Sequence, residues 1–267
     1  MSASWSATSR IPRKNRTRLR SLPSRIIPTR PRTQLKRQLR NEVDVSNPVP
    51  SAASPASTLK QSFRETPLYA ILDTAMRVKL SPAAMVESLL RAGVRVLQYR
   101  HKGKFQRENF EECQALANEI HQAGGVFIIN DRADVAALSG ADGVHLGQED
   151  LPPEKARNLL ETGKIVGYSS HTREQAALAE RLPVDYIAIG PVFPTRTKQN
   201  PDPVVGLSII AEVRTRTANP LVAIGGITLE NAPMVLRAGA DAVAVISGLL
   251  LAEDVESRAR KFLAALR

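Results

Sequence analysis

Residues Asp185–Lys198 read D-Y-I-A-I-G-P-V-F-P-T-R-T-K, an apolar run followed directly by a polar turn. The first half, Tyr186–Val192, is typical of a fully buried strand, and a Gly-Pro pair interrupts it. Thr195, Thr197 and Lys198 then follow. Hydroxyls donate hydrogen bonds and an ammonium supplies a point charge, so this turn is suited to holding a phosphate. Alone, T-x-T-K fits an ordinary polar loop equally well. The residues at the other strand ends must decide between a phosphate-binding turn and such a loop.

Apolar runs of this kind recur along the chain and alternate with longer amphipathic stretches. The predicted strands are Leu68–Asp73, Val94–Arg100, Phe127–Asp131, Gly143–Gly147, Ile165–Ser170, Asp185–Val192, Leu221–Gly226 and Ala242–Ser247. The predicted helices are Ser81–Ala92, Arg107–Ala123, Arg132–Leu138, Pro153–Glu161, Arg173–Arg181, Leu207–Arg216, Leu229–Ala238 and Val255–Leu266. Ser81, Thr172 and Thr228 stand where helix N-caps are expected.

Strands that alternate with helices indicate a parallel sheet in an α/β fold. Eight such units in about 200 residues predict a closed (β/α)8 TIM barrel. An open doubly wound sheet is the alternative, but no G-x-G-x-x-G motif follows any strand, which weakens the dinucleotide-binding version. In the barrel, the active site is expected at the C-terminal strand ends.

The positive charge of the chain is concentrated near its N-terminus. The formal net charge is +11, yet residues 1–40 hold twelve Lys or Arg and no acidic residue, which leaves 25 basic and 26 acidic side chains in the remainder. We therefore predict a disordered, Arg-, Ser- and Pro-rich basic tail at 1–62 and a barrel catalytic domain at 63–267, and expect a chain that begins near Gln61 to fold.

The composition of the tail fits three interpretations: a transit peptide for an organelle, an electrostatic contact with nucleic acid or anionic membrane, or a segment without function. No apolar run reaches the ~18 residues that a membrane helix needs, so we predict no membrane span and a cytoplasmic location. The single cysteine, Cys113, cannot form an internal disulfide, which fits a reducing compartment.

Polar side chains follow the second, third and fourth predicted strands. Gln98 and Arg100 share one side of a strand, and a buried Arg needs an anionic partner, either a ligand or a neighbouring carboxylate. Asn130 and Asp131 follow the next strand, and the fourth is followed by H-L-G-Q-E-D, which ends in Asp150. Two carboxylates on neighbouring strand ends could share Mg²⁺, although either could instead cap the following helix. The histidine of H-L-G, His145, is expected to be a structural barrel residue.

The remaining strand ends carry hydroxyls and glycines. Ser169-Ser170-His171 follows the fifth strand without a G-x-S-x-G elbow, so hydrogen-bonding roles are favoured over a nucleophilic pair. Gly225-Gly226 follows the seventh strand and Ile246-Ser247 ends the eighth. The loops after strands seven and eight form the usual phosphate site of this fold, where backbone N–H groups bind the anion and glycine allows close approach.

This set of strand ends resembles thiamine phosphate synthases, the enzymes that join the two rings of thiamine. The resemblance spans about Leu68–Leu266 and is carried, in order, by Q-Y-R-H-K, I-N-D, H-L-G-Q-E-D, S-S-H-T, G-P-V-F-P-T-R-T-K, A-I-G-G-I and V-I-S. It implies a Mg²⁺-dependent transferase that joins 4-amino-5-hydroxymethyl-2-methylpyrimidine diphosphate to 4-methyl-5-(2-hydroxyethyl)thiazole phosphate. Thiamine phosphate and diphosphate are the implied products, and the implied route is dissociative, through a pyrimidine cation.

The resemblance also implies a role for each matching residue. The pyrimidine diphosphate would be held by Gln98, Arg100, Lys102, Asn130, Ser169 and Lys198. Mg²⁺ would be held by Asp131 and Asp150, and the thiazole phosphate by Thr195, Thr197, Gly226, Ile246 and Ser247. Arg100, Lys102 and Lys198 are the expected catalytic residues, because cations stabilise charge that develops on the leaving diphosphate.

Two other functions compete with this one. A thiazole tautomerase would share the barrel and the thiazole-phosphate loops, but an isomerase has no use for Lys102, Asp150 and the T-x-T-K loop. A scaffold whose basic tail binds nucleic acid is a different class. It is weakly supported, because aromatic residues make up only 4% of the chain and the tail offers one Trp and no Tyr for base stacking.

Overall fold

The computed structural model describes residues 55–76, 78–195, 197 and 202–267. Eight parallel strands pair in chain order and close into a barrel, as the sequence predicts. They are β1 (Leu68–Asp73), β2 (Val96–Arg100), β3 (Val126–Asn130), β4 (Gly143–Leu146), β5 (Ile165–Ser170), β6 (Tyr186–Ile189), β7 (Leu221–Ile224) and β8 (Ala242–Val245). Closure comes from pairing of β1 with β8, where Leu68 stands opposite Val243.

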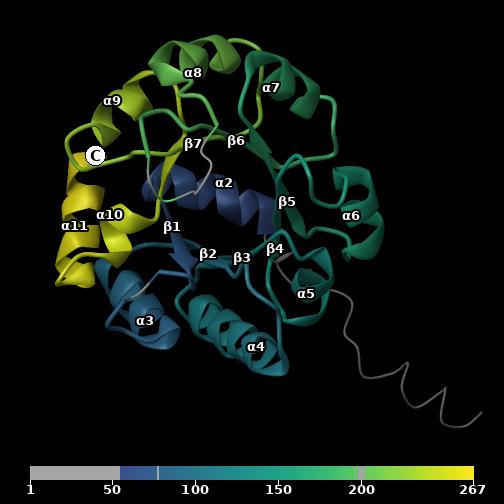
Figure 1. Cartoon of the computed structure of the whole chain (residues 1–267), viewed down its shortest axis with the longest axis vertical. Coiled ribbons are helices and arrows are strands. Elements are labelled where there is room, and N and C mark those ends of the chain that lie inside the picture. Colours follow the sequence, from purple (N-terminus) through teal and green to yellow (C-terminus); the bar gives the residue numbers. More distant parts are fainter. Residues whose placement is uncertain (1–54, 77, 196, 198–201) are drawn as a thin grey trace, which may run out of the picture. The chain divides into compact units, whose positions relative to one another are not determined.

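The helices form a ring around the barrel (Figure 1). They are α3 (Pro82–Ala92), α4 (Arg107–Gln122), α5 (Ala133–Leu138), α6 (Pro153–Leu159), α7 (Arg173–Ala179), α8 (Gly206–Arg214), α9 (Ala232–Arg237) and α11 (Val255–Ala265), with the short α10 (Ser247–Leu250) after β8. All eight predicted helices are present, with ends shifted by a few residues at most, whereas α10 was not predicted. Within the described ranges, none of the helices has the length and apolar character needed to cross a membrane.

Alternate residues of each strand fill two separate cores. In β1, Tyr69 and Ile71 belong to the cluster inside the barrel, whereas Leu68, Ala70 and Leu72 pack against the surrounding helices. Both faces of the strand are therefore apolar, which is why the parallel strands appear in the sequence as short continuous apolar runs rather than alternating ones.

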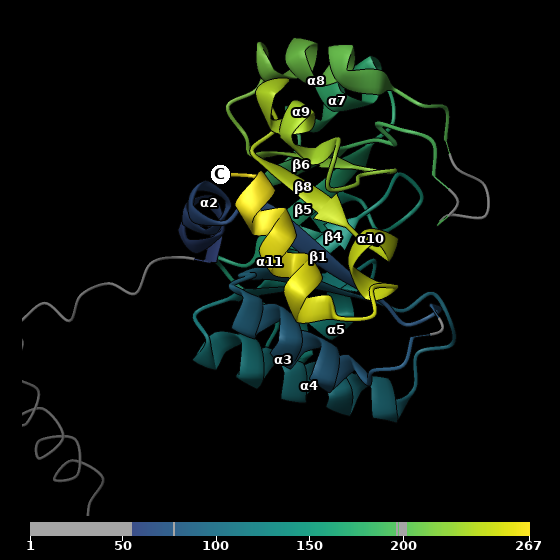
Figure 2. The ribbon, with the colours of Figure 1, turned by 90° about the vertical axis from the view of Figure 1, so that its left-hand side faces the viewer.

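Helix α2 (Pro55–Glu65) lies across the barrel axis (Figure 1), at the end opposite α10 (Figure 2). Leu59 and Phe63 are 0% and 3% exposed and belong to the cluster inside the barrel, so the helix closes its N-terminal end. Residues 55–62 of the segment predicted to be disordered are thus helical. A chain that begins near Gln61 would lack the buried Leu59, and its folding stays a prediction. Two apolar residues four positions apart are too short a pattern to signal a helix from sequence alone. The rest of that segment, 1–54, lies outside the described residues.

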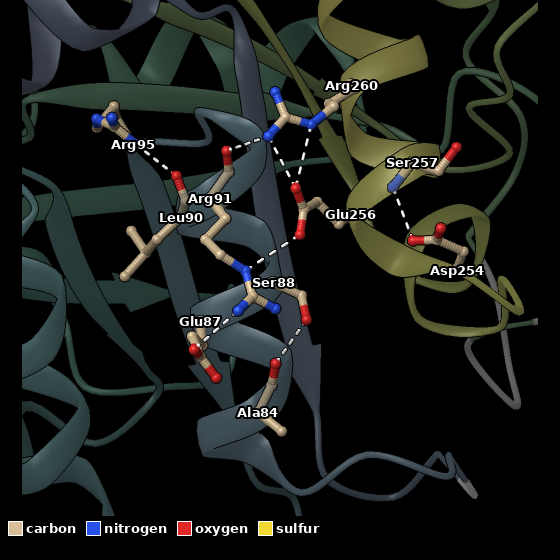
Figure 3. A network of polar contacts seen from close by, with 10 residues as sticks. All are labelled: Ala84, Glu87, Ser88, Leu90, Arg91, Arg95, Asp254, Glu256, Ser257 and Arg260. Atoms are coloured by element: carbon tan, nitrogen blue, oxygen red, sulfur yellow. Dashed lines mark hydrogen bonds and ion pairs between the residues drawn. The ribbon is translucent and has the colours of Figure 1, made fainter.

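An exposed charge network joins the first and last helices of the ring, α3 and α11 (Figure 3). Arg91 Nε lies 3.1 Å from a Glu256 carboxylate oxygen, and Arg260 donates to the Arg91 carbonyl oxygen at 2.8 Å. The Arg91 and Arg260 side chains are more than half exposed, so these contacts contribute little free energy. The barrel is therefore closed by its strands, and the network only aligns the two helices.

Two of the three predicted N-caps are confirmed. The Ser81 hydroxyl accepts a hydrogen bond from the Ala84 N–H, and the Thr172 hydroxyl accepts one from the Gln175 N–H. Thr228 is not the cap of α9, which begins at Ala232. It exchanges backbone–side-chain hydrogen bonds with Asn231 instead, so the same chemistry forms a turn before the helix.

The burial of Leu59 gives a test of the role of α2. Leu59→Ala should lower the free energy of unfolding by about 2–5 kcal/mol, because it leaves a cavity at the closed end of the barrel. Lys60→Ala, one residue further along on the exposed side of the same helix, is the matched control and should change stability by less than about 0.5 kcal/mol. Urea unfolding of both variants measures the difference, and equal losses would show that α2 does not pack as described.

Candidate active site

Arg100, at the C-terminal end of β2, pairs with a carboxylate of the same rim. Its guanidinium forms an ion pair with Asp73, which stands opposite it at the end of β1. The Asp73 side chain is 3% exposed and also accepts a hydrogen bond from the Ala75 N–H at 3.0 Å. A neighbouring carboxylate therefore holds the Arg100 cation at the barrel mouth.

Lys102, Asp131 and Asp150 form a second charged cluster on this rim, defined here as the carboxylate cluster. The Lys102 ammonium lies 2.5 Å from an Asp131 carboxylate oxygen, and the Gly147 N–H donates to an Asp150 carboxylate oxygen at 2.6 Å. Burial raises the pKa of the Asp150 carboxyl; the Gly147 N–H opposes this shift, and the neighbouring Asp131 carboxyl adds to it. The two carboxyl groups therefore interact directly, as expected for neighbouring strand ends.

The backbone of Asp131 adopts φ +63°, the left-handed conformation that non-glycine residues rarely take. Its N–H donates to the His145 carbonyl oxygen at 2.8 Å, which extends the pairing of β3 with β4 by one residue. The helix-cap alternative for Asp131 is not observed, since Arg132 occupies the N-cap position of α5. A strained conformation held by an inter-strand hydrogen bond places this carboxylate at the mouth.

The donor set of the carboxylate cluster fits a hard divalent cation. Two carboxylates supply oxygen ligands of the kind Mg²⁺ prefers. Across the described ranges, no group of three or more His, Cys, Asp or Glu side chains is arranged to hold a metal ion by itself. A cation held by Asp131 and Asp150 would thus take its other ligands from water or from a bound anion, which is how Mg²⁺ usually binds beside phosphates.

Asn130 and Ser170 carry buried polar atoms without hydrogen-bond partners. Asn130 is 8% exposed, and its side-chain nitrogen has no partner among the described residues. The Ser170 hydroxyl, at the end of β5, is in the same situation. Unpaired buried donors are uncommon in proteins, so the Asn130 amide at the end of β3 is suited to an acceptor supplied by a ligand.

A chain of hydrogen bonds crosses the interior of the barrel and joins two predicted site residues. Gln98 donates to the Tyr69 hydroxyl, which lies 3.0 Å from the Tyr186 hydroxyl. His145 contacts Tyr186 through Nδ1 at 2.9 Å and Ser169 through Nε2 at 2.8 Å. His145 is thus a barrel-interior residue whose two ring nitrogens are both used, as the sequence analysis expected.

The loops after β6, β7 and β8 meet on the opposite side of the mouth. The Thr197 hydroxyl lies 3.3 Å from the Ser247 hydroxyl and receives a long hydrogen bond from Thr195 at 3.4 Å. Gly226 has φ +65°, and a Cβ on it would lie 2.5 Å from the Pro194 carbonyl oxygen, so only glycine fits against the β6 loop. Ile246 precedes the first residue of α10. The predicted phosphate loops are therefore brought together in space.

The structure also corrects and extends the predicted set. Lys198 lies outside the described residues. His171 contacts the Gly190 carbonyl oxygen through Nδ1 at 2.7 Å, which favours the hydrogen-bonding role over a nucleophilic pair. Asp73, Tyr69 and Tyr186 were not predicted. The sequence did contain a signal for Asp73, because the apolar run L-Y-A-I-L-D of the first predicted strand ends in a carboxylate.

Cations and carboxylates on one side of a closed barrel rim, with glycines and hydroxyls on the other, define a TIM-barrel protein suited to phosphorylated ligands. The family model described as "Thiamine monophosphate synthase" matches residues 68–249. Thiamine-phosphate synthase of Syntrophomonas wolfei is 43% identical over 73% of this chain and 93% of its own, and that of Koribacter versatilis is 45% identical over 74% and 95%. The solved thiamine phosphate pyrophosphorylase of Pyrococcus furiosus has a TM-score of 0.70 and 34% identity, covering 76% and 96%.

The chain therefore belongs to the thiamine monophosphate synthase family. It is a transferase of thiamine biosynthesis with thiamine-phosphate synthase activity, as the sequence resemblance predicted.

The buried imidazole of His145 gives a pH-dependent test of this interior chain. Burial lowers the pKa of His145 from 6.5 to about 4, so the unfolded chain takes up a proton that the folded chain does not. Stability should therefore fall as pH drops from 6.5 to about 4. His145→Gln should flatten this dependence, measured by urea unfolding with pH 7.5 as the reference for each protein. Parallel pH profiles for the two proteins would contradict the buried neutral imidazole.

Proposed function

We propose that the barrel joins the pyrimidine diphosphate to the thiazole phosphate in a Mg²⁺-dependent reaction, with the two substrates on opposite sides of the mouth. The pyrimidine diphosphate occupies the ends of β2–β5, where it contacts Gln98, Arg100, Lys102, Asn130 and Ser169, together with Lys198 from the β6 loop. The thiazole phosphate occupies the ends of β6–β8, where it contacts Thr195, Thr197, Gly226, Ile246 and Ser247. The carboxylate cluster is the observation that carries this proposal.

The chemistry demands little acid–base catalysis. The bond from the pyrimidine methylene carbon to the diphosphate oxygen breaks first and leaves a pyrimidine cation, and the thiazole nitrogen then attacks that carbon with its own lone pair. Negative charge develops on the departing diphosphate, and stabilising it is the task of the site. Mg²⁺ bound at Asp131 and Asp150 would neutralise part of that charge.

The cations of the site fit this task. Arg100 and Lys102 each stand beside a carboxylate at the rim, so both cations are already held where a diphosphate would arrive. A guanidinium matches phosphate oxygens with two parallel donors, and an ammonium acts as a compact charge. The unpaired Asn130 amide supplies a further donor. We assign Arg100, Lys102 and Lys198 the stabilisation of the leaving group.

The carboxylate cluster also argues against the tautomerase alternative, because isomerisation of a thiazole phosphate releases no diphosphate and needs no site for one. Residues 1–54 take no part in the proposal, which concerns the barrel alone, and cytoplasmic location stays a prediction.

The direct test is a discontinuous assay for thiamine phosphate with both ring substrates and Mg²⁺. Product that forms equally well in excess chelator would overturn the metal dependence, and no product in any condition would overturn the function.

Asp131→Asn and Asp150→Asn should each lower turnover by about 100-fold or more, because each removes a ligand of the cation that stabilises the leaving group. Without metal, both variants should be as stable as the wild type or slightly more so, since two adjacent carboxylates repel each other. Asp134→Asn is the control, because Asp134 lies on α5 in an exposed ion pair with Arg132, and this variant should keep its turnover. Turnover at saturating Mg²⁺ and thermal unfolding in chelator measure both effects; a variant that simply fails to fold would assign that carboxylate a structural role.

Ser247→Ala should raise the KM for the thiazole phosphate by about tenfold, the effect of one lost hydrogen bond to a charged group. The KM for the pyrimidine diphosphate should change far less, because Ser247 belongs to the β8 side of the mouth. Ser257→Ala, on α11, serves as the control. Steady-state kinetics with each substrate varied in turn gives both constants, and a larger effect on the pyrimidine diphosphate would reverse the assignment of the two sides.

A further inference from the structure

The hydrogen-bonded chain inside the barrel connects two residues of the proposed diphosphate site by groups that the mechanism does not use. It runs from Gln98 through Tyr69, Tyr186 and His145 to Ser169. Gln98 and the two tyrosines are at most 2% exposed, and His145 is 9% exposed. Because water has almost no access to these groups, each hydroxyl proton must find its acceptor within the chain.

Counting protons gives a direction, from donor to acceptor, to the hydrogen-bonded chain of side chains. The Gln98 amide donates to the Tyr69 oxygen, so the Tyr69 proton is left to donate to the Tyr186 oxygen. Tyr186 then donates to His145 Nδ1, which must be the unprotonated ring nitrogen. His145 Nε2 carries the hydrogen and donates it to the Ser169 oxygen.

With the Gln98 amide nitrogen facing Tyr69, as in the structure, the opposite direction fails at the far end of the hydrogen-bonded chain. If Ser169 donated to His145 Nε2, the Nδ1–H would donate to Tyr186, and Tyr186 would donate to Tyr69. The Tyr69 oxygen would then accept two hydrogen bonds, and no hydrogen bond found for Tyr69 would take its own proton inside the apolar interior. Buried hydroxyls rarely lack an acceptor, so the first direction is favoured.

We propose that Tyr69, Tyr186 and His145 are positioning residues that fix Ser169 as a hydrogen-bond donor to the leaving diphosphate. The inference rests on the proposed contact between Ser169 and the diphosphate. With a lone pair engaged by His145, the Ser169 proton is free to point to the mouth. A donor is what a developing negative charge requires, and hydrogen bonds in series polarise one another.

The tyrosine rings are held from below by α2. The Phe63 ring centre lies 6.1 Å from that of Tyr69 and 6.4 Å from that of Tyr186, and the two tyrosines meet edge to face at 6.0 Å. Edge-to-face packing fixes ring orientation and therefore the direction of each hydroxyl. The helix that closes the barrel thus sets the geometry of a chain that ends at the mouth.

The tautomer of His145 is the first test, read by ¹⁵N NMR of the full chain labelled at its four histidines. The wild type should show the Nε2–H form for His145, identified by loss of its signals in His145→Gln. Tyr186→Phe removes the donor to Nδ1 and should give a mixture of both tautomers. A wild-type Nδ1–H tautomer, or an unchanged tautomer in Tyr186→Phe, would overturn the direction of the chain. This readout needs no turnover, so it is independent of the proposed function.

A double-mutant cycle tests the link to Ser169. Tyr186→Phe should lower kcat by about tenfold in the wild-type background and have little effect in Ser169→Ala, because the chain acts through that hydroxyl. A purely structural role would lower kcat equally in both backgrounds and would overturn the proposal. Tyr99→Phe is the matched control: this buried tyrosine of β2 bonds Glu112 outside the barrel and should keep its kcat. A Tyr186→Phe variant with wild-type kcat would also overturn the positioning role.

Discussion

Backbone pairing of β1 with β8 is the interaction on which the rest of the molecule depends. It removes both edges of the sheet, and closure places eight strand ends on one rim. Lys102, Asp131 and Asp150 come from three different strand ends, and they form one cluster because β2 pairs with β3 and β3 pairs with β4. The loops of β6, β7 and β8 are brought together in the same way.

The rim is divided by charge. Its β1–β4 side holds cations that are matched by carboxylates, as in the pairs Arg100–Asp73 and Lys102–Asp131. The buried Asp73 carboxylate would be costly without a cation beside it, so its pair with Arg100 allows this part of the site to exist before any ligand binds. Among the described residues, the β6–β8 side relies on hydroxyls and on glycine backbone, which carry no net charge, and Lys198 of the β6 loop lies outside these residues. One side is thus suited to the more highly charged substrate, and the other to a single phosphate.

The sequence predicted the barrel because each strand is a short apolar run bounded by turn residues, and the strand order then placed Asp131 and Asp150 side by side. Other features of the structure are not indicated by any short stretch of the sequence. Of its apolar residues, helix α2 buries only Leu59 and Phe63, which is too little for a period to appear. The pairing of Arg100 with Asp73 depends on the register between two strands, and the interior chain from Gln98 to Ser169 depends on side chains from five strands. Such features are set by packing in three dimensions and not by neighbours along the chain.

Closure of the barrel at its N-terminal end also determines where small molecules can enter. Leu59 and Phe63 fill the N-terminal end, and the tyrosines above them fill the layer beneath the site, so the described residues close the barrel at that end. In the proposed reaction, both substrates would then arrive at the C-terminal rim and both products would leave from it. Because the proposed sites lie on opposite sides of that rim, neither substrate would have to pass through the site of the other.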